Sequence, residues 1–72
     1  MVKIRVNGVE KTLQKEGQPL TYAGALVLAG FDPALTLTVT WITPAYDGTL
    51  VRGKQVLVSE GMSINVMHTG AA

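Results

Sequence analysis

The chain has 72 residues, a formal net charge of +1 and no cysteine. This length accommodates one small domain and leaves no room for a second core or an internal active-site cleft. Disulfides are excluded, and one histidine with five acidic residues is too few for a structural metal site. The dispersed basic residues do not form the cationic face typical of nucleic-acid binders. With no charged-then-apolar leader and no apolar run near the ~20 residues that span a bilayer, we expect a soluble cytoplasmic protein.

The apolar content is high for so small a chain, at 47% hydrophobic and 15% charged residues. A small domain has a large surface relative to its volume, so part of this apolar content must face outward unless a partner covers it. The composition therefore favours a protein that interacts with other proteins.

The first 14 residues predict a β-hairpin. Residues 2–6 alternate apolar and cationic side chains, and residues 9–14 form the return strand. Asn7 and Gly8 both tolerate the positive φ of a two-residue type I′ turn. The resulting register pairs Val6 with Val9. It places five apolar residues on the core face: Val2, Ile4, Val6, Val9 and Leu13.

A short helix is predicted after a polar turn at residues 15–19. Thr21 is a suitable N-cap, and Gly30 is suited to a left-handed C-cap. Within residues 22–29, four residues recur at the spacing of a buried helical stripe: Tyr22, Ala25, Leu26 and Ala29. Val27 lies on the opposite side of this helix.

Three strand-like runs follow the helix, at residues 36–42, 54–58 and 62–68. A loop at residues 43–49 separates the first two. Hairpin, helix and three strands in this order are typical of a ubiquitin-like β-grasp, an α+β fold. In it, a mixed sheet of four to five strands packs on one helix, and the last strand lies parallel to the first because the helix supplies the crossover.

Short motifs occur in a fixed order along nearly the whole chain. They are residues 4–8 (IRVNG), 21–22 (TY), 28–30 (LAG), 38–41 (TVTW), 48–53 (GTLVRG), 60–62 (EGM), 65–66 (NV) and 69–70 (TG), with Val56 and Val58 between them. In these motifs the chain resembles the bacterial multiubiquitin or ubiquitin-like modifier domains. It departs from them at Ala23 and Gly24, where the family often has acidic residues, and at Leu57, where it often has a polar one. The family is named for tandem copies, and one copy is present here.

The resemblance implies a protein modifier rather than an enzyme. Its implied partners are an adenylating activating enzyme that uses ATP, a conjugating-enzyme-like protein, a deconjugating or processing peptidase, and target proteins. The modifier itself would hold no cofactor. Related bacterial systems are linked to antiviral defence.

The implied chemistry is expected at the end of the chain, with a globular domain at residues 1–69 and a tail at residues 70–72. The C-terminal carboxylate would attack the α-phosphate of ATP and then be transferred through an acyl intermediate to a nucleophile. Small residues suit a terminus that threads a narrow channel, and Gly70, Ala71 and Ala72 meet this requirement. Either Ala72 is the working terminus or a peptidase exposes Gly70. The alternative is a frayed end without function.

A partner-binding surface is expected on the sheet. Alternation places Ile42, Leu57 and Met67 outward, on strands that should be neighbours in a β-grasp, with His68 where the last strand enters the tail. As the lone imidazole, His68 is expected to be a half-exposed polar residue or an aid to docking the tail. The same surface suits self-association. Asp47 and Arg52 are expected to be solvated.

Two other functions fit the same fold. A sulfur carrier shares the adenylation step but needs a terminal glycine, which Ala72 does not provide without processing. A structural or interaction module would use the fold without tail chemistry. An intrinsic enzyme is disfavoured because no nucleophile–base pair or phosphate-binding loop is evident.

Overall fold

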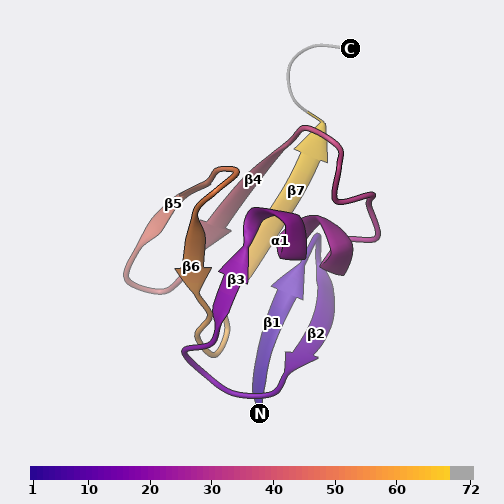
Figure 1. The fold of residues 1–72 in the computed structure, drawn as a ribbon. Helices are drawn as coiled ribbons and strands as arrows, with labels where there is room; N and C mark the ends of the chain where they lie inside the picture. The colour runs from indigo at the N-terminus through magenta and orange to yellow at the C-terminus, as the bar shows by residue number, and fades with distance from the viewer. Residues whose placement is uncertain (69–72) are drawn as a thin grey trace.

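The computed structural model describes residues 1–68, which form one helix packed on a mixed five-stranded sheet, with a smaller two-stranded sheet beside it (Figure 1). The elements in chain order are β1 Val2–Val6, β2 Val9–Leu13, β3 Pro19–Thr21, α1 Tyr22–Leu28, β4 Leu37–Ile42, β5 Asp47–Leu50, β6 Gln55–Leu57 and β7 Ser63–His68. The large sheet has the strand order β2-β1-β7-β4-β5, and β3 pairs with β6. The predicted α+β class and the predicted mixed sheet of four to five strands are confirmed, and the arrangement is compatible with a β-grasp.

The predicted hairpin is present with its predicted register. Asn7 has φ 51° and Gly8 has φ 82°, as a type I′ turn requires, and Val6 pairs with Val9. The expectation that Val9 joins the core is wrong, because 57% of this residue is exposed. Strand β2 is the edge strand of the sheet, so it has a neighbouring strand on one side only and its side chains are less covered.

Asn7 also connects the hairpin to the last strand. Its side-chain amide donates to the Val66 carbonyl at 3.0 Å, and its Oδ1 accepts from the Val66 N–H at 2.7 Å. The Cα pairing between β1 and β7 ends at Val6 and Ile64, so the Asn7 side chain continues the hydrogen bonding beyond the ladder. It thereby satisfies backbone groups that would otherwise be unpaired in the sheet.

Helix α1 has the caps that the sequence predicts. The Thr21 hydroxyl accepts from the Gly24 N–H at 3.0 Å, and Gly30 has φ 85°. Gly30 donates to the Val27 carbonyl and Phe31 to the Leu26 carbonyl, which is the hydrogen-bond pair of a Schellman motif. The stripe is one residue shorter than expected, because the partly buried Ala29 is the C-cap rather than a helical residue.

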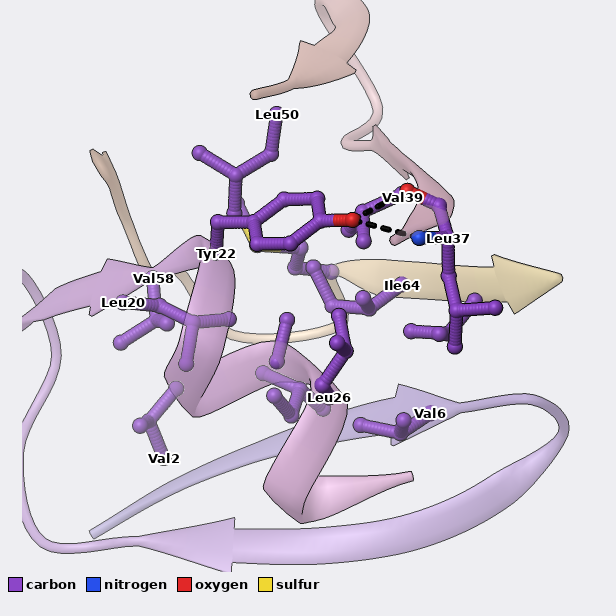
Figure 2. Packing of buried hydrophobic residues seen from close by; sticks show 14 residues of the cluster. Val2, Val6, Leu20, Tyr22, Leu26, Leu37, Val39, Leu50, Val58 and Ile64 are labelled. Atoms are coloured by element: carbon purple, nitrogen blue, oxygen red, sulfur yellow. Dashed lines mark hydrogen bonds between the residues drawn. The ribbon is translucent and has the colours of Figure 1, made fainter. Parts of the chain in front are cut away.

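Strand β7 occupies the centre of the large sheet. It runs parallel to β1 and antiparallel to β4, as predicted for the last strand (Figure 1). The helix lies across the inner face of this sheet and buries an apolar core (Figure 2). The buried residues are Val2, Ile4, Val6, Leu20, Tyr22, Ala25, Leu26, Leu37, Val39, Leu50, Val58, Met62, Ile64 and Val66.

Tyr22 ties the start of the helix to the start of β4. Its phenolic hydroxyl donates to the Leu37 carbonyl at 2.5 Å and accepts from the Leu37 N–H at 2.6 Å (Figure 2). Tyr22 is 5% exposed, so both hydrogen bonds lie inside the core, where unpaired backbone groups are costly. This link holds β4 at the point where Leu37 pairs with His68 of β7.

Two connections differ from the sequence prediction. The loop expected at residues 43–49 is shorter, because β5 begins at Asp47 and pairs with β4. The turn expected at residues 15–19 ends earlier, because Pro19 begins β3. Strand β6 pairs with β3 rather than joining the large sheet. Within the described residues α1 has 7 residues, and no helix there approaches the length and apolarity that a bilayer-spanning helix needs.

Candidate functional site

An apolar hollow of about 690 Å³ lies between the β4–β5 loop, β6 and the turn that precedes β7. We call it the Trp41 groove. It is lined by Glu16, Trp41, Thr43, Pro44, Ala45, Tyr46, Val56, Leu57, Ser59, Glu60 and Met62. Met62 is buried and Trp41 half-buried, whereas Tyr46 and Leu57 are 74% and 58% exposed. The groove therefore joins the end of the core to a large exposed apolar surface, a combination common at binding sites.

One wall of the groove is a tightly hydrogen-bonded loop. The Thr43 hydroxyl accepts from the Tyr46 N–H at 2.9 Å and donates to the Tyr46 carbonyl at 3.1 Å. The Thr43 N–H also donates to the Tyr46 carbonyl, at 2.7 Å. These bonds close the four-residue connection between β4 and β5 and present Pro44 and Tyr46 outward. The wall is thus formed by the chain itself, before any partner binds.

The indole of Trp41 lies over Gly48 of the neighbouring strand. The two residues are cross-strand partners, and a Cβ built on Gly48 would be 2.7 Å from Cζ2 of Trp41. A side chain at Gly48 would therefore displace the ring, since real Cβ atoms essentially never approach so closely. The absence of a side chain at this position lets the indole lie flat against β5 and line the groove.

The charged groups that line the groove are both acidic. Oε1 of Glu16 accepts from the Glu60 N–H at 3.0 Å, and Oε1 of Glu60 accepts from the Lys3 N–H at 3.0 Å. Both residues are exposed, and within residues 1–68 neither carboxylate forms a salt bridge. The bond to the Glu60 N–H holds the Glu16 carboxylate at the groove, whereas the bond to the Lys3 N–H directs the Glu60 carboxylate towards β1, where Glu60 also lines a second hollow with Lys3, Arg5 and Glu10. Both charged residues at this end of the groove are acidic.

The predicted partner surface does not form one patch. Ile42, Leu57 and Met67 are exposed at 49%, 58% and 51%, as alternation predicts. The expectation that their strands adjoin is wrong for Leu57, because β6 belongs to the other sheet. Met67 pairs with Thr38, four residues from Ile42 along β4, which is about 13 Å at the usual rise of a strand.

The three residues therefore occupy separate places. Leu57 lines the Trp41 groove, and Ile42 lines a neighbouring hollow of about 370 Å³ that shares the β4–β5 loop with it. Between Ile42 and Met67, the outward side chains of the paired strands are polar: Thr38, Thr40, Ser63 and Asn65. The apolar surface gathers at the end of β4 rather than on the open face of the sheet.

His68 lies at the other end of the sheet, where β7 ends. It is exposed, and its ring meets the Phe31 ring edge to face with centroids 5.9 Å apart. The predicted conjugation residues Gly70, Ala71 and Ala72 lie outside the described residues. The predicted docking role of His68 stays a prediction.

Arg52 is exposed, as expected, but it also has structural contacts that the sequence did not predict. One guanidinium nitrogen donates to the Leu35 carbonyl at 2.7 Å and to the Pro33 carbonyl at 3.3 Å. The guanidinium also lies 4.6 Å from the centre of the Tyr22 ring. Arg52 thus holds the connection between α1 and β4 against the core. Partners this distant in sequence leave no local pattern that would identify them.

The sequence contains only a weak indication of the Trp41 groove. Pro44 and Tyr46 lie in a short connection between strands. Such a connection has few neighbouring residues, so an aromatic side chain in it is expected to be exposed. Glu16 and Glu60 are far apart in the chain and come together because β3 and β6 pair.

The chemistry that this arrangement supports is recognition of another molecule. Within residues 1–68, no group of three or more histidine, aspartate or glutamate side chains is placed to hold a metal ion. Comparison with protein families, with curated protein sequences and with solved structures finds no match to this chain.

Proposed function

We propose that this chain is a ubiquitin-like protein modifier with a β-grasp fold, activated at its C-terminus and conjugated to target proteins. One observation carries the proposal: the strand order β2-β1-β7-β4-β5, with β1 and β7 parallel and one helix on the inner face. This is the arrangement expected of a β-grasp, in which the last strand is central and delivers the chain to one end of the sheet. The sequence motifs support the same assignment, including a role in a bacterial ubiquitination-like pathway of the cytoplasm.

The proposed reaction begins at the terminal carboxylate. One of its oxygens attacks the α-phosphorus of ATP on the activating enzyme, pyrophosphate leaves, and an acyl adenylate forms. A nucleophile on the enzyme or the target then attacks the acyl carbon and AMP leaves. The role of this chain is to present the terminus from a rigid scaffold, while its partners supply the catalytic groups.

The test is intact-mass spectrometry of the chain incubated with ATP and the adenylating activating enzyme that the proposal implies. Three versions would be compared: the 72-residue chain, a chain that ends at Gly70, and a chain that ends at His68. We expect an ATP-dependent acyl adduct with the first or the second version and none with the third. The version that reacts identifies Ala72 or Gly70 as the working terminus.

A matched control separates binding from chemistry. The chain that ends at His68 retains every described strand, so it should still compete with the reactive chain for the enzyme. If all three versions bind but none forms an adduct with ATP, the modifier proposal fails. A terminal thiocarboxylate instead of a conjugate would indicate a sulfur carrier.

The Trp41 groove favours a second candidate function, an interaction module that uses the fold without tail chemistry. A preformed apolar hollow with exposed aromatic walls is a feature that a conjugation tail does not require. Under this alternative, truncation at His68 leaves partner affinity unchanged. Under the modifier proposal, the same truncation abolishes function while the fold persists.

A further inference from the structure

We propose that the Trp41 groove binds an extended segment of a partner protein in which an arginine or lysine adjoins a large apolar side chain. This inference concerns a surface at the opposite end of β4 and β7 from His68, the last described residue, and does not depend on activation of the tail. It rests on the charge of the groove, its size and apolar lining, and the fixed geometry of its walls.

Charge selects the basic side chain of the partner. The chain has six basic and five acidic residues, yet the two charged residues that line the groove, Glu16 and Glu60, are both acidic. Neither has a cationic partner within residues 1–68. A cation beside Glu16 gains an attractive interaction with a carboxylate that forms no salt bridge within residues 1–68, and Glu60 adds negative charge to the same end of the groove.

The apolar lining selects the neighbouring side chain and the stem of the basic one. Trp41, Tyr46 and Leu57 offer a large apolar surface, and a volume of about 690 Å³ accommodates more than one side chain. An arginine can lie along an aromatic ring with its stem on apolar surface while its guanidinium reaches a carboxylate. The second side chain of the partner would fill the deeper end of the groove, towards the buried Met62.

The walls of the groove are already in place before a ligand binds, so a short segment is sufficient as a ligand. Thr43 closes the β4–β5 loop through its hydroxyl, and Gly48 lets the indole of Trp41 lie against β5. The walls therefore lose little conformational freedom on binding, which is one of the main costs of association.

The probe is a blocked hexapeptide with the sequence glycine-arginine-leucine-arginine-phenylalanine-glycine. Two matched peptides replace both arginines by glutamate, or both apolar residues by serine. Binding is measured by amide chemical shifts of the ¹⁵N-labelled 72-residue chain and by fluorescence of Trp41, the sole tryptophan. We expect saturable shifts at the amides of residues 43, 45, 46 and 55–57. The two altered peptides should bind about tenfold more weakly or worse.

Charge-neutral isosteres test the acidic end of the groove. Glu16→Gln and Glu60→Gln each keep the oxygen that accepts a backbone hydrogen bond, so the fold is retained. Each should weaken the arginine peptide about threefold and reduce the salt dependence of its binding. The control Glu10→Gln makes the same charge change on β2, outside the groove, and should leave affinity unchanged.

Apolar variants test the other half of the proposal. Leu57→Ser should weaken the peptide strongly, whereas Val27→Ser, an equally exposed position on the outer side of α1, should not. Urea unfolding of each variant confirms that it is folded under the binding conditions.

Four results would overturn the proposal. They are the absence of saturable shifts at millimolar arginine peptide, equal binding of the glutamate peptide, equal losses from Glu10→Gln and Glu16→Gln, and groove shifts that grow with protein concentration alone. The last result would identify a second copy of this chain as the occupant.

Discussion

Tyr22 shows how much of this small core depends on one polar atom. Its hydroxyl satisfies both backbone groups of Leu37, and its ring lies under the guanidinium of Arg52. The N-terminus of the helix, the start of β4 and the Arg52 turn therefore meet at one side chain. Sequence periodicity identifies Tyr22 as a buried helical residue but says nothing of the partner of its hydroxyl.

Replacing this hydroxyl tests the link directly. Tyr22→Phe keeps the ring and leaves the Leu37 N–H and carbonyl unpaired inside the core. We expect a loss of about 1–3 kcal/mol in the free energy of unfolding, measured with urea. The control Tyr46→Phe removes an exposed hydroxyl that makes no hydrogen bond within the described residues, and it should change stability by less than about 0.5 kcal/mol. Equal effects of the two changes would contradict the role given to Tyr22.

At the scale of elements, the strands β4 and β5 form the part of the fold that builds the groove. Their connecting loop is closed by Thr43, and their paired residues Trp41 and Gly48 place the indole. The loop predicted at residues 43–49 concealed β5, because glycine and aspartate are poor strand formers and indicate a turn. The hydrogen bonds to β4 and the packing of Trp41 on Gly48 outweigh the local preference of these residues for a turn.

A methyl group at Gly48 should disturb this pair. The backbone there does not have a positive φ, so Gly48→Ala fits locally, but its Cβ overlaps the Trp41 ring. We expect a loss of about 1–3 kcal/mol in the free energy of unfolding and an altered Trp41 emission spectrum.

A double-mutant cycle identifies the cause of that loss. In a Trp41→Leu background, followed by circular dichroism, Gly48→Ala should cost less than in the original chain by more than about 0.5 kcal/mol. An unchanged cost would show that the ring is not the obstacle.

At the scale of the whole molecule, the last strand is the centre of the sheet. Strand β7 pairs with β1 on one side and β4 on the other, and the Asn7 side chain adds two hydrogen bonds to it. Residues from the two ends of the sequence thus meet in the middle of the core. The fold cannot be completed before β7 is available.

A chain that ends at residue 61 should therefore fail to fold. It lacks Met62, Ile64 and Val66, each of which contributes about 1.5–3 kcal/mol on burial. Their sum is comparable with the whole stability of a small domain, about 5–15 kcal/mol. Amide proton shifts should collapse to the narrow range of an unfolded chain. Dispersed shifts with cooperative unfolding would show that β7 is dispensable.

The sequence by itself determined the features that depend on near neighbours. Asn7 and Gly8 specify the turn because few residues tolerate positive φ, and Thr21 and Gly30 specify the helix caps because their groups act within a few residues. Alternation likewise predicted that Met67 points outward, as its 51% exposure shows, since adjacent strand residues point to opposite faces.

Only the tertiary structure decided which distant segments meet. Alternation predicts that Leu57 points outward but not that β6 pairs with β3, because the strand period contains no information on the partner. For the same reason the sequence did not predict the contacts of Arg52 or the acidic end of the Trp41 groove. These features arise from pairings between residues far apart in the chain, and the whole core selects those pairings through the apolar surface that it buries.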